Sequence, residues 1–594
     1  MRIRPTLALA CLGWLFTCFS ASGIAGSKDP AYVRRAAPDV RGAGLPPTLK
    51  LRRTAVALAK AGQTRRNDLR HADLSLFSHS EDCVACHNGL VTPSGEDVSI
   101  GSTWRSTMMA NAARDPYWQA GVRRETIDHP THSAAIQDEC AGCHMPMATQ
   151  IARAAGGKGD VFSHLPIAGR DAPLERLAVD GVSCTVCHQI SSDRLGTSAS
   201  FNGEFVIKPT PTDGKRIIFG PYRIDAGRKT IMHSVSGFVQ AEGAHIKQSE
   251  LCATCHTLIT KALGPNGEVV GSLPEQMNFQ EWLNSDFSRE QRSCQSCHMP
   301  RAPGPLRSSS VLGDNRESLA RHTFVGGNAF MVRLLNRYRN ELGVDALPME
   351  LEATASATIR QLQEDTATLT VTTPTVNAGR VTFDVEVRNL TGHKYPTGYP
   401  SRRTWLHVIV RDAQGRAVFE SGAFNNSGAI AGNDADVDPN RFEPHYELIT
   451  RADQVQIYEP ILGDRFGVPT TGLLTATQYL KDNRLLPRGF DKTAADKDIA
   501  VHGEALGDAD FAGGGDRVRY SVDAQSAGPF TIDVELRYQS VAYRWAHNLE
   551  RYDAPEPRRF VGYYNALSST SSVTVARATA RPNLVGLDVR RPGL

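Results

Sequence analysis

The sequence lacks three features, and each absence narrows the class of protein. Its 66 Lys and Arg residues nearly balance 63 Asp and Glu residues, so the formal net charge is only +3. A chain with no basic excess is not expected to bind nucleic acid. Beyond the N-terminus there is no apolar run of the roughly 20 residues that a membrane-spanning helix needs. No cysteine follows Cys297, which excludes disulfide or thiol chemistry in the C-terminal half.

The one long apolar segment lies at the start of the chain. MRIRPTLALACLGWLFTCFSASGIAG has a short basic start, an apolar run and then small residues. This order predicts a Sec-type signal peptide over residues 1–25, with cleavage after Gly23 or Ala25. The mature protein is then expected to be periplasmic or secreted. An uncleaved membrane anchor is the alternative.

The cysteines that are present fall into one repeated pattern. Two of the twelve belong to the leader, and the other ten form CVACH, CAGCH, CTVCH, CATCH and CQSCH. Each unit is the attachment signature of c-type haem, in which two thiols bond the porphyrin and the next histidine binds the iron. The predicted attachment residues are Cys83, Cys86, Cys140, Cys143, Cys184, Cys187, Cys252, Cys255, Cys294 and Cys297. The predicted proximal ligands are His87, His144, His188, His256 and His298.

Two other cofactor classes fit this pattern less well. Zinc ribbons pair two C-x-x-C units, so five units leave one over, and zinc does not explain a histidine after every second cysteine. A disulfide framework suits an exported protein but does not explain five histidines at one offset. We therefore predict five covalently bound haem c groups within residues 83–298. A segment of this length cannot enclose each of five haems in an apolar shell of its own. The haems are therefore expected to lie close together and to exchange electrons.

The sequence predicts a multidomain fold. A basic, irregular lead-in over residues 26–75 precedes a mainly α, irregular pentahaem domain at 76–348. From 349 to 594, segments such as RVTFDVEVRNL and FTIDVELRYQSV alternate apolar and polar residues, which is typical of strands. We expect an antiparallel, β-sandwich-like domain there, interrupted by a long loop at 422–515.

Histidines outside the motifs are candidates for the second axial position of each iron. Four candidates precede residue 350, and a fifth lies in the C-terminal domain: His129, His164, His245, His322 and His393. His393 occurs in NLTGHKYPTGYPSRR, where glycines and prolines predict a tight loop that reaches back to a haem. The alternative for each of these residues is an ordinary surface, turn or packed histidine.

Several phrases resemble a family of exported multihaem cytochromes c. The family is related to the tetrahaem cytochrome of ammonia oxidisers and, more distantly, to hydroxylamine oxidoreductase and pentahaem nitrite reductase. The phrases include SEDCVACHNGL, DGVSCTVCHQI, HIKQSELCATCHTL, RHTFVGGNAFM and TGHKYPTGYPSRRTWLHV. The resemblance covers nearly the whole chain from about residue 80. It implies an electron-transfer role, although the wider group also contains oxidoreductases.

The resemblance also raises a question about WRSTMMANAARDPYW. Relatives often carry W-x-x-S-x-H-A there, with the histidine as a distal ligand, and Met109 stands in the matching position. A thioether ligand raises the potential of a haem relative to two histidines, so the resemblance implies a high-potential haem at one of the first two motifs. Packing beside an apolar cofactor is the alternative for Met109, and Met108 is the neighbouring candidate.

A weaker candidate site lies in NDADVDPN, where Asp434, Asp436 and Asp438 alternate. Their oxygens have a spacing that calcium can use, but Pro439 stands where an EF-hand loop needs glycine, and His445 stands in place of the final glutamate. An ordinary acidic loop is the favoured interpretation.

The sequence thus favours an electron carrier outside the cytoplasm. It would connect a redox protein or a membrane quinol-oxidising donor to a terminal acceptor. The alternative is an oxidoreductase in which one haem lacks a distal ligand and acts on a small nitrogen or sulfur compound. Pentahaem nitrite reductases use C-x-x-C-K at the catalytic haem, and all five motifs here end in histidine. The sequence leaves the oligomeric state and the direction of electron flow open.

Overall fold

The computed structural model describes residues 73–581, except 170, 524, 525 and 527. These residues belong to one compact unit. The predicted signal peptide at 1–25 and all but the last three residues of the predicted lead-in at 26–75 lie outside the described residues. Among the helices that the structure describes, none combines the length and the apolar character needed to cross a membrane.

Each C-x-x-C-H motif lies wholly or partly in a helix. These helices are α2 (Ser80–Val84), α5 (Ser133–His144), α8 (Cys184–Cys187), α10 (Ser249–His256) and α13 (Cys294–His298). In α5, α10 and α13 the motif forms the last turn, so the helix ends at the motif histidine. Residues three apart lie on one face of a helix, so each turn presents its two thiols to the same side.

Nine further helices connect and support the motifs. They are α3 (Ile100–Arg105), α4 (Pro116–Asp128), α6 (Pro146–Ala154), α7 (Pro173–Val179), α9 (Ala226–Ser236), α11 (Asn278–Leu283), α12 (Asp286–Arg289), α14 (Ala329–Arg337) and α15 (Pro348–Glu364). Proline opens α4, α6, α7 and α15, where its missing N–H is not needed. Asp115 caps α4 by accepting the backbone N–H groups of Tyr117 and Trp118.

The motif-bearing part also contains strands, so it is less purely helical than the sequence predicts. β1 (Arg216–Gly220) pairs in parallel with β2 (Phe238–Glu242), and β3 (Thr257–Leu263) forms a hairpin with β4 (Val269–Met277). Short pairs β5 (Arg301–Ala302) with β8 (Leu319–Ala320), and β6 (Leu306–Arg307) with β7 (Asn315–Arg316), follow. The β3–β4 hairpin is extended because it packs against the C-terminal part. The Leu263 N–H, for example, donates to the Leu474 carbonyl at 2.6 Å.

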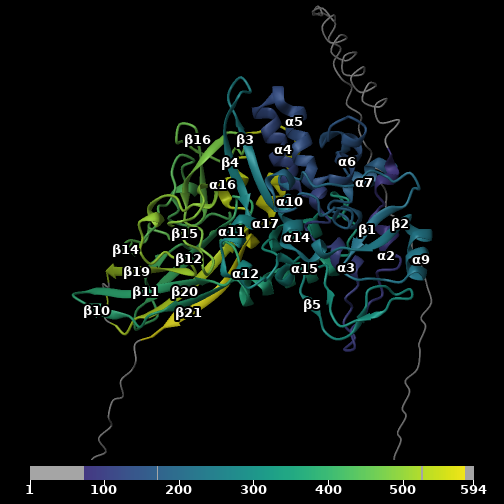
Figure 1. The fold of residues 1–594 in the computed structure, drawn as a ribbon. Helices are drawn as coiled ribbons and strands as arrows, with labels where there is room; N and C mark the ends of the chain where they lie inside the picture. Colours follow the sequence, from purple (N-terminus) through teal and green to yellow (C-terminus); the bar gives the residue numbers. More distant parts are fainter. Residues whose placement is uncertain (1–72, 170, 524–525, 527, 582–594) are drawn as a thin grey trace, which may run out of the picture. The chain divides into compact units, whose positions relative to one another are not determined.

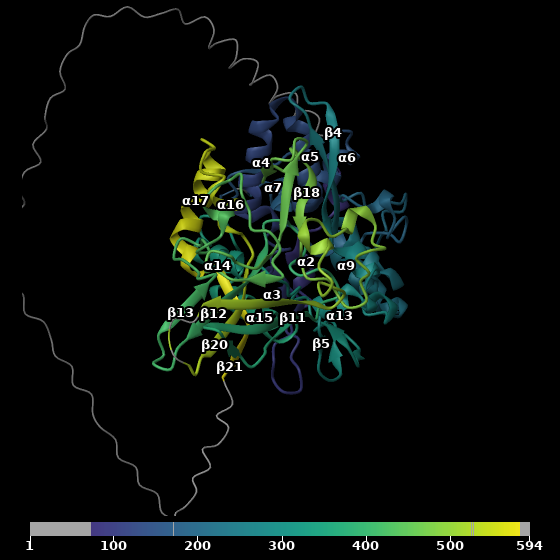
Figure 2. The same ribbon diagram turned by 90° about the vertical axis from the view of Figure 1, so that its left-hand side faces the viewer.

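The C-terminal part is built on two five-stranded sheets. One contains β9 (Ala367–Val371), β10 (Thr375–Asn377), β11 (Arg380–Asn389), β14 (Leu448–Ile449) and β19 (Gly515–Asp523). The other contains β12 (Arg403–Arg411), β13 (Ala417–Ser421), β15 (Ile457–Tyr458), β20 (Thr531–Gln539) and β21 (Ser572–Ala580). Their long strands β11, β12, β20 and β21 lie side by side in Figures 1 and 2. The pairings are antiparallel except β14 with β19. Buried residues alternate along β11 and β20, as the sequence pattern predicts.

The two sheets share one hydrophobic core. The ring of Phe383 on β11 stacks on Tyr520 of β19, with centroids 5.1 Å apart. Phe419 on β13 of the other sheet meets the same Tyr520 edge-on at 6.3 Å. The inner faces of both sheets therefore contribute side chains to a single buried cluster.

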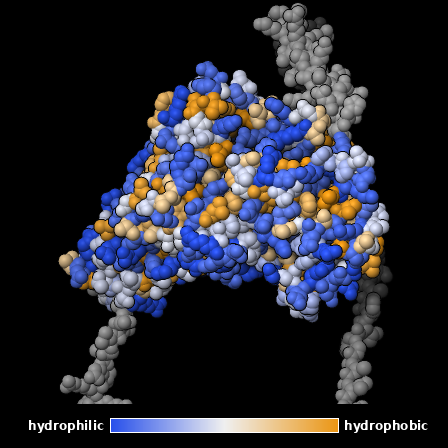
Figure 3. Space-filling view, in the orientation of Figure 1, coloured by the Kyte–Doolittle hydropathy of each residue, from blue (hydrophilic) through white to orange (hydrophobic). Residues whose placement is uncertain are grey.

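The segment at 422–515, predicted as an inserted loop, carries secondary structure of its own. β16 (Pro460–Asp464) pairs with β17 (Pro469–Thr470) and β18 (Ala476–Asp482). After β20, α16 (Tyr543–His547) leads to α17 (Pro555–Leu567), which packs on α4 of the motif-bearing part. On the face in Figure 3, hydrophobic and hydrophilic residues are interspersed.

Truncating the shared core should destabilise the protein strongly. Phe383 is 2 % exposed, so Phe383→Ala should lower the free energy of unfolding by about 3–5 kcal/mol through lost burial and a cavity. Val376→Ala on β10 removes an exposed side chain and should change stability by less than about 0.5 kcal/mol. Denaturant titration of the haem-loaded variants measures both. Equal losses would show that Phe383 does not belong to a tightly packed core.

Candidate haem-attachment sites

Thiols of different motifs lie close to one another. The thiols of Cys83 and Cys184 are near enough for each to shift the pKa of the other, which places the first motif beside the third. All ten motif cysteines are free thiols, so these pairs are not disulfides. The helices α2 and α8 that carry the two motifs are also in contact. Groups attached at these two motifs would therefore be immediate neighbours.

The fourth motif lies close to two others. The thiol of Cys255 lies near that of Cys143 in the second motif, and the thiol of Cys252 lies near that of Cys294 in the fifth. Cys187 of the third motif lies near Cys255, which adds to the effect of burial in raising the pKa of Cys187 to about 12. The first motif therefore lies next to the third, and the third lies next to the fourth. The fourth motif also lies next to the second and the fifth.

Two motif histidines each face a second histidine. The rings of His188 and His322 have centroids 6.4 Å apart and planes 23° apart. The rings of His298 and His393 have centroids 6.3 Å apart and planes 11° apart. Two imidazoles on opposite sides of one metal ion, each with a metal–nitrogen bond of about 2 Å, have centroids about 6 Å apart. Both pairs therefore have the separation that one shared iron requires.

The four rings of these pairs share a second feature of metal ligands. The Nδ1 atom of each faces a backbone carbonyl: Phe219 for His188 (2.6 Å), Ala320 for His322 (3.2 Å), Val325 for His298 (2.5 Å) and Lys394 for His393 (2.9 Å). This contact fixes the ring and leaves Nε2 for a metal. Burial lowers the pKa of His322 to about 3 and that of His393 to about 4, which favours the neutral, metal-binding form.

The other three motif histidines have different surroundings. Nδ1 of His87 contacts the Ser308 carbonyl at 2.7 Å, and Nδ1 of His144 contacts the Ala112 carbonyl at 3.0 Å. The indole of Trp118 stacks on the His144 ring, 4.4 Å away and 1° from parallel. Burial lowers the pKa of both His144 and His256 to about 4. In the described part of the chain, none of these three rings faces a histidine as His188 and His298 do.

The remaining predicted distal ligands have mixed environments. His164 is buried, and its Nδ1 lies 3.1 Å from a carboxylate oxygen of Glu175, a pairing common behind metal-bound histidines. His129 has a buried Nε2 without a hydrogen-bond partner in the described residues. Nε2 of His245 donates to the Ile190 carbonyl at 2.9 Å, so only its Nδ1 could bind a metal in this arrangement. The ligand role of these three residues stays a prediction.

The two adjacent methionines lie near different groups. The carbonyl of Met109 accepts the N–H of Val182 at 3.0 Å, just before the third motif. The side chain of Met108 packs against a hydrophobic cluster that includes α14 and α17. The backbone of Met109 therefore lies beside the segment that leads into the third motif. The role of Met109 as an iron ligand stays a prediction.

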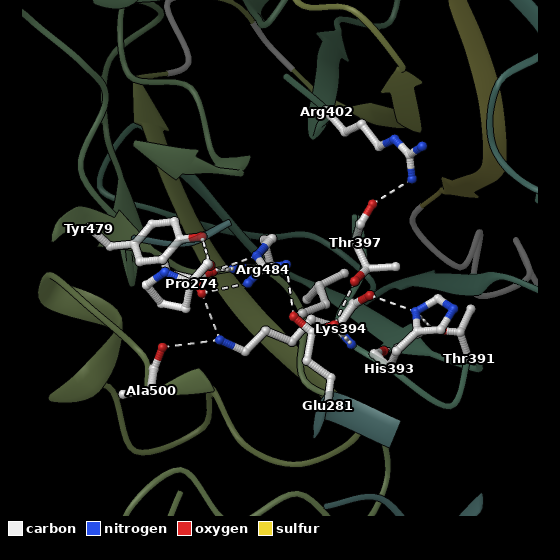
Figure 4. A network of polar contacts seen from close by, with 12 residues as sticks. Pro274, Glu281, Thr391, His393, Lys394, Thr397, Arg402, Tyr479, Arg484 and Ala500 are labelled. Carbon is white, nitrogen blue, oxygen red and sulfur yellow. Dashed lines mark hydrogen bonds and ion pairs between the residues drawn. The ribbon is translucent and has the colours of Figure 1, made fainter. Parts of the chain in front are cut away.

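A buried network of charges holds the His393 loop (Figure 4). It consists of Glu281 on α11, Lys394 next to His393, Asp482 at the end of β18, and Arg484. The Lys394 ammonium lies 2.7 Å from Asp482, and Arg484 pairs with Asp482 at 2.8 Å and with Glu281 at 2.9 Å. Although burial opposes it, Arg484 and Lys394 hold the pKa of Asp482 below its usual value. Two positive and two negative charges thus neutralise one another out of water.

The same network reaches the backbone of the loop. Glu281 accepts the Lys394 N–H at 3.2 Å and the Thr397 hydroxyl at 2.5 Å. At Gly392, an added Cβ would lie 3.0 Å from the Phe287 ring on α12, so the ring would have to shift to admit a larger residue. Sequence reasoning found His393 through its loop but missed Glu281, because nothing in its local sequence marks it. Trp118 was missed as a partner of His144 for the same reason.

Two polar clusters in the C-terminal part are engaged by protein groups. The predicted calcium candidates have separate partners: Asp434 pairs with Arg441 (2.5 Å), Asp436 with Arg403 (2.8 Å), and Asp438 accepts the Asn440 N–H (2.9 Å). A second cluster contains His445, Asp508 and Asp516. There Nδ1 of His445 accepts hydrogen bonds from Gln456 and Asn483, so the proton is on Nε2 and is donated to Asp508 at 3.0 Å. A protonated nitrogen cannot bind a cation, so this cluster is a hydrogen-bond network.

Comparisons with known proteins give one structural similarity. No family model matches the chain, and no curated protein matches it. The crystal structure of a penta-heme cytochrome c552 from Thermochromatium tepidum is similar over 85% of this chain and 99% of that one, with 15% sequence identity and a TM-score of 0.45. At that identity and TM-score, the case for a function rests on the motifs and the geometry of the site.

Removing the Glu281 charge should destabilise the protein. Glu281→Gln leaves the buried Arg484 and Lys394 with only Asp482 as a counter-charge, and losing one partner of a buried pair costs about 3–5 kcal/mol. Glu290→Gln, which breaks an exposed pair with Arg488, should cost less than about 1 kcal/mol. Urea titration of the haem-loaded variants gives both free energies of unfolding. A small loss in Glu281→Gln would mean that the network does not hold the loop.

Proposed function

We propose that this chain is an exported multihaem cytochrome c that carries five covalently attached haems and relays electrons between redox partners. The observation that carries the proposal is the pair of histidine couples, His188 with His322 and His298 with His393, at centroid separations of 6.4 and 6.3 Å. In each couple, one ring follows a C-x-x-C unit and the other comes from a distant segment. Five such motifs in one chain favour haem over zinc.

The chain has three tasks in such a protein. Its thiols attach the group, its histidines bind the iron from two sides, and its backbone carbonyls orient the rings. When bound, haem supplies one-electron transfer at a potential that the axial ligands and the burial set. Two histidines on one iron favour a centre that transfers electrons without binding a substrate. The couples at the third and fifth motifs are therefore carrier sites.

The neighbouring thiols supply a continuous path. Cys83 with Cys184, Cys143 with Cys255, and Cys252 with Cys294 bring attachment points of different motifs together. Attachment points this near to one another keep neighbouring cofactors close, and close cofactors exchange electrons. With Cys187 near Cys255, all five motifs belong to one branched series whose branch point is the fourth motif.

Location and partners are part of the proposal. Haem c is attached outside the cytoplasm, and the N-terminal sequence has the pattern of a Sec-type signal. The partners would be a redox protein or a membrane quinol-oxidising donor on one side and a terminal acceptor on the other. The near-neutral net charge gives no reason to include nucleic acid.

One observation favours an oxidoreductase as a second candidate. His87, His144 and His256 have no facing histidine of the kind found at His188 and His298 within the described residues. An iron held from one side only would be open to a small nitrogen or sulfur compound. His256 lies in a desolvated environment near Arg402, which would favour an anionic substrate there.

Low-temperature EPR of the oxidised, haem-loaded protein tests the two candidates. A carrier should show only low-spin iron, because each iron has two strong axial ligands. An open site should show high-spin iron whose signal changes when nitrite or hydroxylamine is added. Near-infrared magnetic circular dichroism of the same sample recognises an iron–methionine bond, and its presence would favour Met109 as a ligand.

Changing one facing histidine tests the proposed ligand pairs directly. His393→Met should replace nitrogen by a thioether on one iron, which should produce an iron–methionine band and raise one reduction potential by on the order of 0.1 V. His547→Met changes an exposed histidine outside the pairs and should alter neither. The measurements are near-infrared magnetic circular dichroism and a spectroscopic redox titration. An unchanged spectrum in His393→Met would remove His393 from the proposed ligand set.

A further inference from the structure

A cavity of about 510 Å³ lies apart from the five motifs. One wall is Arg124 on α4, and the others are residues 435–440, 469–471 and 543–551 of the C-terminal part. No motif cysteine or histidine lines it. Three arginines do: Arg124, Arg544 and Arg551. The cavity therefore has a chemical character of its own.

Arg544 is the most unusual of these residues. Its residue surface is only 6% exposed, its terminal nitrogen donates to the Pro439 carbonyl at 2.8 Å, and its buried Nε has no hydrogen-bond partner among the residues that the structure describes. Within the described residues no carboxylate lies at ion-pairing distance from it. Burial lowers the pKa of Arg544, although nearby Glu459 and Asp436 oppose the shift. A buried guanidinium with an unused donor and no carboxylate in contact with it costs free energy unless an anion completes the site.

The other charges in the lining do not supply that anion. Asp436 pairs with the buried Arg403 at 2.8 Å, and Glu550 contacts Nδ1 of His547 at 3.1 Å and has no ion pair with an arginine among the described residues. Arg124 donates to the carbonyl and the hydroxyl of Thr471 at 2.6 and 2.8 Å and to the Tyr552 hydroxyl at 3.2 Å, and it lies 3.6 Å from a carboxylate oxygen of Asp128. Among the described residues, the lining thus contains three guanidinium groups and two carboxylates.

The donors match one ligand class. Arg551 is exposed and donates to the Tyr552 hydroxyl at 2.8 Å, so its guanidinium lies at the rim and is free to turn toward a ligand. The planar fork of a guanidinium donates two parallel hydrogen bonds to a carboxylate or to an oxyanion such as phosphate. A cavity of this size has room for a small molecule of either kind.

We propose that this cavity binds a small anion, either a carboxylate or an inorganic oxyanion, through Arg544, Arg124 and Arg551. The anion completes the hydrogen bonding of Arg544 and places a negative charge in direct contact with it. The site joins α4 of the motif-bearing part to the C-terminal part, so its occupation should also stabilise the contact between them.

Calorimetric titration of the haem-loaded full chain tests the proposal. Inorganic phosphate is the probe in one arm and succinate in the other, with the ionic strength held constant by chloride. We expect saturable one-to-one binding in at least one arm. The probe that binds with the higher affinity identifies the ligand class, oxyanion or carboxylate. Arg551→Gln removes a charge-assisted donor and should weaken that binding about tenfold.

Arg558→Gln is the matched control. Arg558 is an exposed arginine of α17 outside the cavity, so the same loss of charge there should leave the affinity within about twofold. Arg544→Lys keeps the positive charge but removes the pair of parallel guanidinium donors, so it should also weaken binding of the anion. Since Arg551 is exposed, its variant keeps the test valid even if a change at Arg544 prevents folding. Absence of saturable binding in both arms, or equal affinities in Arg551→Gln and Arg558→Gln, would overturn the proposal.

Discussion

The contact on which most of the structure depends is the one between His298 and His393. One ring follows the fifth motif and the other stands in the loop between β11 and β12, yet their centroids are 6.3 Å apart. A shared metal tolerates errors of only a few tenths of an ångström in such a separation. Under the proposed function the two rings bind one iron, so the C-terminal sheets have to be held rigidly against the motif-bearing part. All described residues do belong to one compact unit.

Several features serve this constraint. Asn389, at the end of β11, donates to the carbonyls of His393 and Leu485 at 2.8 and 3.0 Å and so ties the start of the loop to its neighbour. Glu281, in the motif-bearing part, accepts the backbone N–H of Lys394 and so ties the loop to that part. A buried set of four charges gives little net stability compared with apolar packing, but it allows only one arrangement of its members. We infer that the network fixes the position of the loop more than it increases the stability of the fold.

Many of the functional residues could be predicted from the sequence alone. The offset of histidine from cysteine in all five motifs predicted the attachment residues, and the alternation in RVTFDVEVRNL predicted strand β11. The loop around His393 was predicted from its glycines and prolines. The hairpin β3–β4 was not predicted, because its strand character comes from packing against β18 and Leu474. Trp118 and Glu281 were missed because their partners are distant in sequence.

The sequence by itself determined the type of cofactor, the number of attachment motifs and the division into helix-rich and strand-rich parts, since these follow from local spacing and periodicity. Only the tertiary structure decided which histidine faces which, and which motifs are neighbours. His322 and His129 are equally plausible in sequence, but His322 faces a motif histidine at 6.4 Å, whereas the buried Nε2 of His129 has no hydrogen-bond partner in the described part of the chain. The reason is physical: a ligand pair is a distance between segments far apart in the chain, and packing sets that distance.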